Sequence, residues 1–210
     1  MANSIMVFCS HSDDEIIGVG GTLAKYRKEG KEIVTVIFSY GEKSHPHLKE
    51  EVISEARQRE TEDIDKIFGR ESIFLGLEEG KIREESNNKN IREQIKVLVK
   101  RYRPEKIFTH SESDPHPDHK AVNHVVLSTL RKAKYHGDIY TFEVWNILNE
   151  NKPVIYIDIS ETFNLKKRAL KKFKSQKLSI YPLWFPMWLR AKSYGKKCSC
   201  KYAEKFYKIQ

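Results

Sequence analysis

The sequence predicts an α/β protein with a Rossmann-like, mostly parallel sheet and helices on both of its faces. Between residues 4 and 133, short apolar runs alternate with longer amphipathic segments. This alternation is typical of strand–helix–strand units with right-handed crossovers. The run EIVTVIFSY at 32–40 is rich in β-branched residues, as are strands that are buried on both faces of a parallel sheet.

The first elements can be assigned from the amino terminus onward. Residues 4–10 form an apolar run that predicts a strand, and residues 14–30 predict a loop leading into a helix that ends near Gly30. Residues 48–69 predict a long amphipathic helix with Gly69 as its stop. The candidates for the apolar side of that helix are Val52, Ile53, Ala56, Ile64, Ile67 and Phe68.

The same reading continues through the rest of the chain. Pro104 ends one predicted helix, and Pro117 suits the first turn of another. No repeat, low-complexity linker or composition break divides the sequence, so we expect residues 1–210 to form a single domain. The further predicted strands are 72–77, 106–111, 139–145 and 154–160, and the further predicted helices are 90–104, 117–133 and 161–176.

Composition excludes several classes of protein. Hydrophobic residues make up 39% and charged residues 32% of the chain, which favours a globular rather than a disordered protein. No apolar stretch reaches the roughly 18 residues of a membrane span, and the first residues lack the features of a signal peptide. We therefore expect a cytoplasmic protein without a transmembrane segment. For Cys198 and Cys200, a surface loop is favoured over a metal clip, because no other cysteine pair exists.

The chain is basic, with nine more Lys and Arg than Asp and Glu. The excess gathers in KKRALKKFK at 166–174 and in the C-terminal tail, which favours a solvated helix face that would also attract an anionic substrate. A nucleic-acid or anionic-surface binding protein is the alternative from another functional class, although we expect no specific nucleic-acid partner. The aromatic segment 181–189 is too short and kinked to span a membrane. Packing over the sheet, a subunit contact and a wall of the substrate cleft remain open for it.

Three polar clusters follow predicted strands. They are SHSDDE at 10–15, SYGEK at 39–43 and HSESDPHPDH at 110–119. Because open α/β sheets bind ligands at the carboxyl ends of their strands, we expect the three clusters to meet in one cleft that forms the active site. His45 and His47 follow the second cluster and are expected in a surface loop.

The stretch FCSHSDDEIIGVGGTL at 8–23 could bind either a phosphate or a metal ion. Its glycines give only part of a dinucleotide-binding pattern, since Leu23 stands where the third glycine would fall, and no P-loop Lys-Ser/Thr pair follows. The carboxylates of Asp13, Asp14 and Glu15 would also oppose a phosphate. These features favour the metal site, and the glycines then let the following helix start close to the sheet.

An imidazole and a carboxylate, from His11 and Asp14, form a common zinc-ligand pair. The segment HPDH at 116–119 supplies a third ligand, which leaves one coordination position open for water. Asp13 lies beside these ligands without being needed as one, so we expect it to be the general base. The spare histidine of 116–119 could stabilise an oxyanion or protonate a leaving amine. Each motif alone could instead cap the helix that follows it.

Together these motifs resemble those of the PIG-L/LmbE-type zinc deacetylases. HSDDE followed by GGTLA is similar to the first motif of that family, A-H-P-D-D-E, and HPDHKAV is similar to its second, H-P-D-H-x-A. Ser10 and Ser12 stand where the family usually has alanine and proline. Further segments that resemble the family, in the same order, are EARQRETEDIDKIFG (55–69), FLGLEEG (74–80), DISETFNLKKRALKKFKSQ (158–176) and YAEKF (202–206).

The resemblance implies a role for several residues. The implied zinc ligands are His11, Asp14 and His119. The other implied roles are Asp13 as the base, His116 as oxyanion stabiliser or acid, Asp118 as the group that orients His116, and Arg57 and Glu79 as substrate contacts.

The resemblance also implies an activity. It implies a Zn²⁺ cofactor, and His/Asp sites also accept Fe²⁺ or other divalent ions. The implied reaction is removal of the N-acetyl group from a GlcNAc-type amino sugar by metal-activated water, with the group linked to the sugar left unspecified. The same ligands would serve a metal hydrolase of another amide or ester, and a homo-oligomer is a further possibility.

Overall fold

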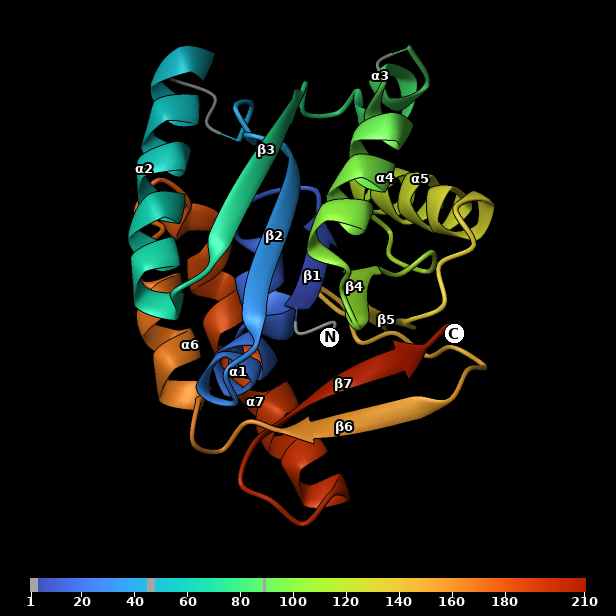
Figure 1. Cartoon of the computed structure of the whole chain (residues 1–210). Helices are drawn as coiled ribbons and strands as arrows, with labels where there is room; N and C mark the ends of the chain where they lie inside the picture. Colours follow the sequence, from blue (N-terminus) through green and yellow to red (C-terminus); the bar gives the residue numbers. More distant parts are fainter. Residues whose placement is uncertain (1–3, 45–47, 89) are drawn as a thin grey trace.

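The computed structural model describes residues 4–44, 48–88 and 90–210, so His45 and His47 lie outside the described residues. Its seven strands form one sheet in the order β3-β2-β1-β4-β5-β7-β6 (Figure 1). The first five strands in this order run parallel to one another, and β7 pairs antiparallel with both β5 and β6. The predicted Rossmann-like, mostly parallel fold is confirmed. The strands are β1 Ser4–Cys9, β2 Glu32–Ser39, β3 Glu71–Leu77, β4 Lys106–His110, β5 Asp138–Phe142, β6 Val154–Asp158 and β7 Ala203–Lys208.

Helices cover both faces of the sheet (Figure 1). Side chains of β1 alternate between two apolar cores, with Ile5 and Val7 in the core under α1, α2, α6 and α7, and Met6 and Phe8 in the core under α3, α4 and α5. This two-sided burial explains why the central strands read as continuous apolar runs. The helices are α1 Asp14–Lys28, α2 Glu50–Phe68, α3 Ile82–Asn88, α4 Ile91–Tyr102, α5 Pro117–Lys132, α6 Phe163–Leu170 and α7 Lys177–Lys197.

The central position of β1 brings the polar clusters together. β1 pairs with β2 on one side and with β4 on the other, and all three strands run in the same direction. At their carboxyl ends the backbone N–H of Ser10 donates to Nε2 of His110 at 2.9 Å, and the N–H of Ser39 donates to the carbonyl of Ser10 at 2.9 Å. The loops that follow these strands therefore share one edge of the sheet.

The last third of the chain differs from the prediction. The helix predicted for 161–176 ends at Leu170, and a second helix, α7, continues through Pro182 and Pro186. Prolines normally disfavour a helix interior, but the inner side of α7 packs into the core and outweighs this cost. Within the described ranges, no helix has the length and apolarity to cross a membrane. The buried stripe on the inner side of α7 is Ile180, Leu183, Met187, Ala191 and Tyr194.

Three smaller corrections follow from the same structure. Residues 203–208 form β7, and residues 82–88 form α3; neither had been predicted as an element. Val52, which we expected on the apolar side of α2, is 52% exposed. Periodicity placed the helix correctly, but Ile53, the next residue, is buried, so Val52 lies beside the buried stripe of α2 and not within it.

Candidate metal centre and active site

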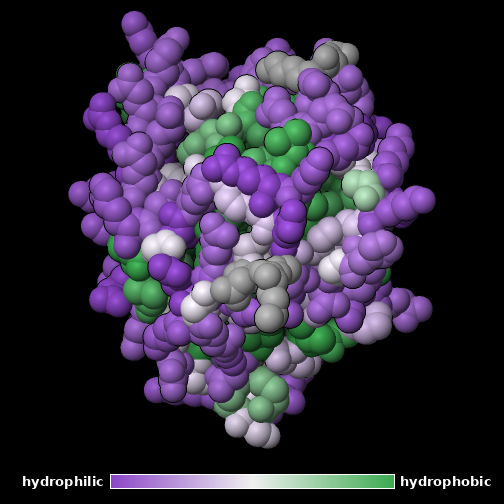
Figure 2. All heavy atoms as spheres, in the orientation of Figure 1, coloured by the Kyte–Doolittle hydropathy of each residue, from purple (hydrophilic) through white to green (hydrophobic). Residues whose placement is uncertain are grey.

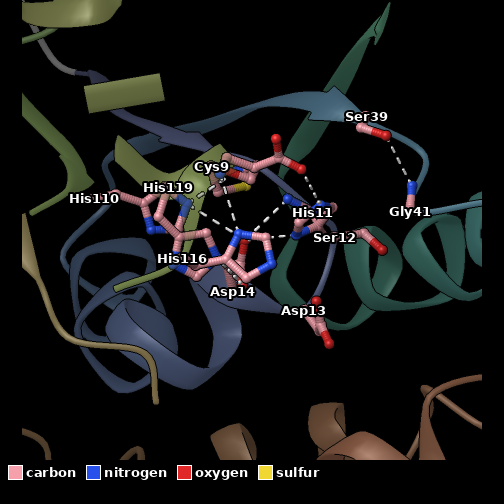
Figure 3. Close-up of polar contacts among 12 residues, drawn as sticks. Cys9, His11, Ser12, Asp13, Asp14, Ser39, Gly41, His110, His116 and His119 are labelled. Atoms are coloured by element: carbon pink, nitrogen blue, oxygen red, sulfur yellow. Dashed lines mark hydrogen bonds and ion pairs between the residues drawn. The ribbon is translucent and has the colours of Figure 1, made fainter. Parts of the chain in front are cut away.

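His11, Asp14 and His119 form a compact, buried group of possible metal ligands. Asp14 lies between the two rings (Figure 3). Its Oδ2 is 3.5 Å from Nδ1 of His11, and its Oδ1 is 3.4 Å from Nε2 of His119. One ligand atom from each residue falls within 4.8 Å of the others. His119 Nε2 is buried and has no hydrogen-bond partner among the described residues, so the donor set fits a divalent cation bound by two imidazoles and one carboxylate.

Each of the two histidines also has a carboxylate on its other ring nitrogen. Nδ1 of His119 is 3.0 Å from Oδ2 of Asp114, and Nε2 of His11 is 3.5 Å from Oδ2 of Asp118. Metal-binding histidines typically have such a partner, which fixes the tautomer and the ring orientation. Asp114 had no assigned role in the sequence interpretation. Its one local signal is a turn in which its Oδ1 accepts the N–H of His116 at 2.9 Å.

Asp118 lies where it was expected but makes a different contact. Its carboxylate faces His11 and accepts the N–H of Gly80 at 2.9 Å. The group of Asp118 that contacts His116 is its backbone N–H, which donates to Nδ1 of His116 at 3.2 Å. Orientation of His116 by residue 118 therefore comes from the backbone, while the side chain supports His11.

His116 is a half-buried residue at the N-terminal cap of α5. Because its Nδ1 accepts a hydrogen bond, the proton of the neutral ring sits on Nε2. Burial and the neighbouring rings of His119 and His11 lower the pKa of His116. A neutral ring that carries a proton on its exposed nitrogen can donate a hydrogen bond to a developing oxyanion.

Asp13 is held by a buried arginine. Nη2 of Arg57, on α2, donates to Oδ1 of Asp13 at 3.0 Å, and its Nε donates to Oγ of Ser12 at 3.2 Å. Arg57 is almost fully buried, and a side chain at Gly41 would collide with its guanidinium. The structure therefore brings Arg57 against Asp13, and contact between Arg57 and a substrate stays a prediction.

Glu79 lies at the rim of the same site. Its Oε1 is 3.9 Å from Nε2 of His11, and its Oε2 accepts the N–H of Lys43 at 2.7 Å. The N–H of Glu79 donates to Oε1 of the buried Glu42 at 2.7 Å, and Oγ of Ser39 donates to the other oxygen of Glu42 at 3.1 Å. Glu42 lay within a predicted cluster but had not been singled out.

The carboxylates give the site a strong preference for positive charge. Burial opposes protonation of His11, but hydrogen bonds to Asp118 and Asp14 raise its pKa to about 10. Burial is likewise outweighed at His119, where Asp14 and Asp114 raise the pKa to about 9. For Asp14 the order is reversed: burial would raise its pKa, but His119 and His11 hold it well below the usual value. A divalent cation would be stabilised by the same carboxylates.

His110 is a support for the site rather than an exposed ligand. It is fully buried, its ring stacks on that of His119 at 3.9 Å, and burial together with His119 lowers its pKa to about 4. His110, Asp114 and His119 form a second group with metal-ligand spacing. Both groups contain an atom that already accepts a backbone hydrogen bond, His110 Nε2 in one and Asp14 Oδ2 in the other. The group around Asp14 is the better candidate because both of its histidine rings lie beside the half-buried ring of His116, at centroid distances of 5.6 and 4.5 Å, whereas His110 is fully buried.

Comparison with known proteins identifies the family. The model described as PIG-L: GlcNAc-PI de-N-acetylase matches residues 6–130, which contain both the HSDDE and the HPDH segments. The chain belongs to the PIG-L family. This confirms the predicted PIG-L/LmbE-like family and, at the level of the family, the predicted enzyme class, a hydrolase of the N-deacetylase type.

The proteins that are similar to this PIG-L protein are named for more than one reaction. Diacetylchitobiose deacetylase of Thermococcus kodakarensis is 26% identical, over 92% of this chain and 78% of the relative. The solved structure of N,N'-diacetylchitobiose deacetylase from Pyrococcus horikoshii has a TM-score of 0.83 at 20% identity and covers 99% of this chain and 84% of that one. GalB, the 4-carboxy-2-hydroxymuconate hydratase of Pseudomonas putida KT2440, also has a TM-score of 0.83, at 19% identity, with 99% and 96% of the two chains covered. At such identities these structures show that the fold is shared, and no more.

Proposed function

We propose that this protein is a metal-dependent N-deacetylase that releases acetate from a GlcNAc-type amino sugar. The observation that carries the proposal is the buried group of His11, Asp14 and His119, with Asp13 beside it, in a chain of the PIG-L family. The proposed ion is Zn²⁺, with Fe²⁺ as the alternative, because two imidazoles and one carboxylate suit both. Cytoplasmic residence and a homo-oligomeric state stay predictions.

The proposed chemistry assigns each group a task at a named atom. A divalent ion in such a site supplies Lewis acidity, which makes a water molecule a nucleophile near neutral pH. Asp13 accepts the proton that this water loses, and Arg57 keeps one oxygen of Asp13 engaged so that the other faces the water. Nε2–H of His116 donates to the acetyl oxygen as negative charge develops there. The proton that Asp13 took from the water then passes to the leaving amine, and His116 stays neutral throughout.

The structure supports a substrate contact more strongly for Glu79 than for Arg57. Glu79 borders the site, and its carboxylate could accept hydrogen bonds from sugar hydroxyls. Arg57 is buried and paired with Asp13, so its contact with substrate would require that pair to open. We therefore propose Glu79 as the substrate contact and Arg57 as the residue that positions Asp13.

The test is acetate release from N-acetylglucosamine, chitooligosaccharides and GlcNAc conjugates, measured on metal-stripped protein before and after addition of Zn²⁺ or Fe²⁺. We expect activity to return with the metal and to be lost in His119→Ala together with bound metal. The matched control is His136→Ala, because His136 is an exposed histidine away from the site. Full acetate release by the metal-stripped protein would contradict the proposal.

A hydratase is the second candidate, because the sequence relative 4-oxalmesaconate hydratase of Pseudomonas putida is 23% identical to this protein over 80% of this chain and 72% of the relative. A hydratase adds water to a carbon–carbon double bond and releases no acetate. Unsaturated dicarboxylates therefore belong in the same substrate panel. Their hydration is measured as a loss of ultraviolet absorbance. Acetate release without any hydration would favour the deacetylase, and the same panel separates hydrolysis of other amides and esters.

A further inference from the structure

The positive charge of the protein is concentrated in one part of the chain. The segment 162–203, which spans α6 and α7, contains twelve Lys and Arg residues and no Asp or Glu, whereas the remaining residues contain 26 basic and 29 acidic ones. Charge asymmetry of this kind favours an anionic partner for the basic region. The exposed basic residues of this segment are Arg168, Lys171, Lys172, Lys174, Lys192, Lys196, Lys197 and Lys201.

The same region also exposes large apolar side chains. Tyr181, Phe185 and Leu189 follow one another at intervals of four residues along the outer side of α7 and are 81%, 67% and 51% exposed. Four-residue spacing places them in one stripe, opposite the stripe that packs into the core. Among the described residues, nine large hydrophobic side chains are exposed, and five of them lie here, because Trp145 and Ile147 adjoin α7. We name these five residues the α7 patch.

Two hollows adjoin the patch, one at each end of its stripe on α7. A pocket of about 630 Å³ joins Leu170 and Lys171, at the end of α6, to Tyr181 and Trp184 of α7. A second hollow, of about 430 Å³, joins Leu189 to the loop that carries Trp145 and Ile147. On the face shown in Figure 2 most residues are hydrophilic, and the largest green area lies near the top of the view, away from α7. A cluster of exposed apolar side chains such as the α7 patch marks an interaction site in a soluble fold.

We propose that the α7 patch docks this protein onto the surface of a bilayer that contains anionic lipids. A helix that lies in the plane of the interface typically presents Trp, Phe and Leu to the acyl boundary and Lys or Arg to the headgroups. Basic residues within reach of an anionic leaflet add electrostatic attraction to this apolar insertion. Lys171 and Lys192 lie near the two ends of the exposed stripe, so apolar insertion and charge attraction act on the same side of the molecule.

The residues around the patch favour a bilayer over two other occupants, which are a second copy of this chain and a nucleic acid. A second copy docked through the same patch would bring the two basic rims together, and like charges repel. Nucleic acid would be attracted by the lysines and could stack on Trp145, Tyr181 and Phe185, but Leu189 and Ile147 offer it neither a stacking ring nor a hydrogen bond. Of these three occupants, a lipid surface is the one that uses the aromatic, the aliphatic and the basic side chains together.

The experiment is flotation of the 210-residue protein with vesicles of phosphatidylcholine, with and without phosphatidylglycerol. We expect binding to vesicles with 30% phosphatidylglycerol that falls at least about tenfold at high salt, and little binding to phosphatidylcholine alone. Equal binding to both vesicles, or none to either, would overturn the proposal. The readout does not depend on enzymatic activity, so it fails or succeeds independently of the proposed deacetylase function.

Paired variants separate the apolar and the basic contributions. We expect Tyr181→Ser/Phe185→Ser/Leu189→Ser to bind at least about tenfold more weakly, whereas Val52→Ser/Val97→Ser, which removes exposed apolar side chains elsewhere, binds as the wild type does. Lys171→Glu/Lys174→Glu should also weaken binding, and Lys100→Glu/Arg101→Glu, on the exposed side of α4, should have a smaller effect.

Controls for the other occupants use the same proteins. We expect each variant to keep the thermal unfolding midpoint of the wild type, and the patch variants to keep its mass in solution. A wild-type oligomer that dissociates in the triple apolar variant would assign the patch to a second copy and overturn the proposal. Binding to RNA or DNA that is lost in Lys171→Glu/Lys174→Glu but kept in the triple apolar variant, without vesicle binding, would also overturn it.

Discussion

Two buried groups of charged residues lie at different positions along α1, one at its start and one near its middle, and their chemistry differs. At the start of the helix, Asp14 lies between the rings of His11 and His119. Near its middle, the carboxylate of Glu204 accepts the N–H groups of Gly21 and Thr22 at 2.9 and 2.8 Å. Nζ of Lys166 donates to that carboxylate and to the carbonyl of Ile17, both at 2.6 Å. The carbonyl of Ile17 and the N–H of Gly21 would be hydrogen-bonded to each other in a regular α-helix. Here each of them is bonded to one partner of the ion pair instead.

The difference between the two groups lies in how their polar atoms are satisfied. Both oxygens of Glu204 and the ammonium of Lys166 have close partners, which is how a stable fold tolerates buried charge. At the other group, His119 Nε2 is buried and lacks a hydrogen-bond partner among the described residues. A buried polar atom without a partner costs free energy unless a ligand satisfies it, and His119 Nε2 belongs to a group with metal-ligand spacing. The satisfied pair is therefore structural, and the unsatisfied group is the candidate site.

The largest effect that this comparison predicts is on catalysis. Asp13→Asn removes the proton acceptor while keeping the size of the side chain, so we expect kcat to fall about 100- to 10,000-fold. Bound metal should stay unchanged, because Asp13 is not among the three proposed ligands. Acetate release and metal content of the purified variant check both statements. The control is Asp63→Asn, an exposed carboxylate on α2, and loss of metal in Asp13→Asn would instead make Asp13 a ligand.

The second prediction concerns stability. Lys166→Met leaves the charge of Glu204 buried without its counter-ion, so we expect the free energy of unfolding to fall by about 3–5 kcal/mol. The double variant Lys166→Met/Glu204→Gln removes both charges and should recover most of that loss. Urea unfolding of both variants tests this, with the exposed Lys172→Met as control. A loss below about 1 kcal/mol in Lys166→Met would show that the pair is not the structural counterpart of the site.

The proposed site could be predicted where short spacing and strand ends decide the geometry. His11 and Asp14 share one turn at the end of β1, and HPDH follows β4, the neighbour of β1 in the sheet. Because β1 and β4 are adjacent parallel strands, the residues at their carboxyl ends lie close together whatever path the following loops take. Asp114 and the contact of Asp118 with His11 depend on the path of the loops. Periodicity carries no information about that path.

The C-terminal third of the fold shows the same limit. Pro182 and Pro186 indicate a broken segment when the sequence is considered alone. The helix persists because its inner stripe is buried in the same core as residues from distant parts of the chain, such as Ile17 and Phe142. Tertiary packing of this kind overrides local propensity. The antiparallel strand β7 was missed for a related reason, since its partners β5 and β6 are distant in the sequence.

The smallest predicted effect tests the carboxylates behind the proposed ligands. Asp114→Asn keeps an oxygen that can accept the N–H of His116, so the turn should persist, but it removes the negative charge beside Nδ1 of His119. We expect metal affinity to fall about 10- to 100-fold, with an unchanged unfolding midpoint of the metal-free protein. Competition with a chelator of known affinity measures this, and the exposed Glu112→Gln in the same loop is the control. Because the midpoint reports only folding, weaker metal binding at a constant midpoint would place Asp114 in the metal site rather than in the scaffold. An unchanged metal affinity would mean that Asp114 serves only to hold the turn that leads to His116.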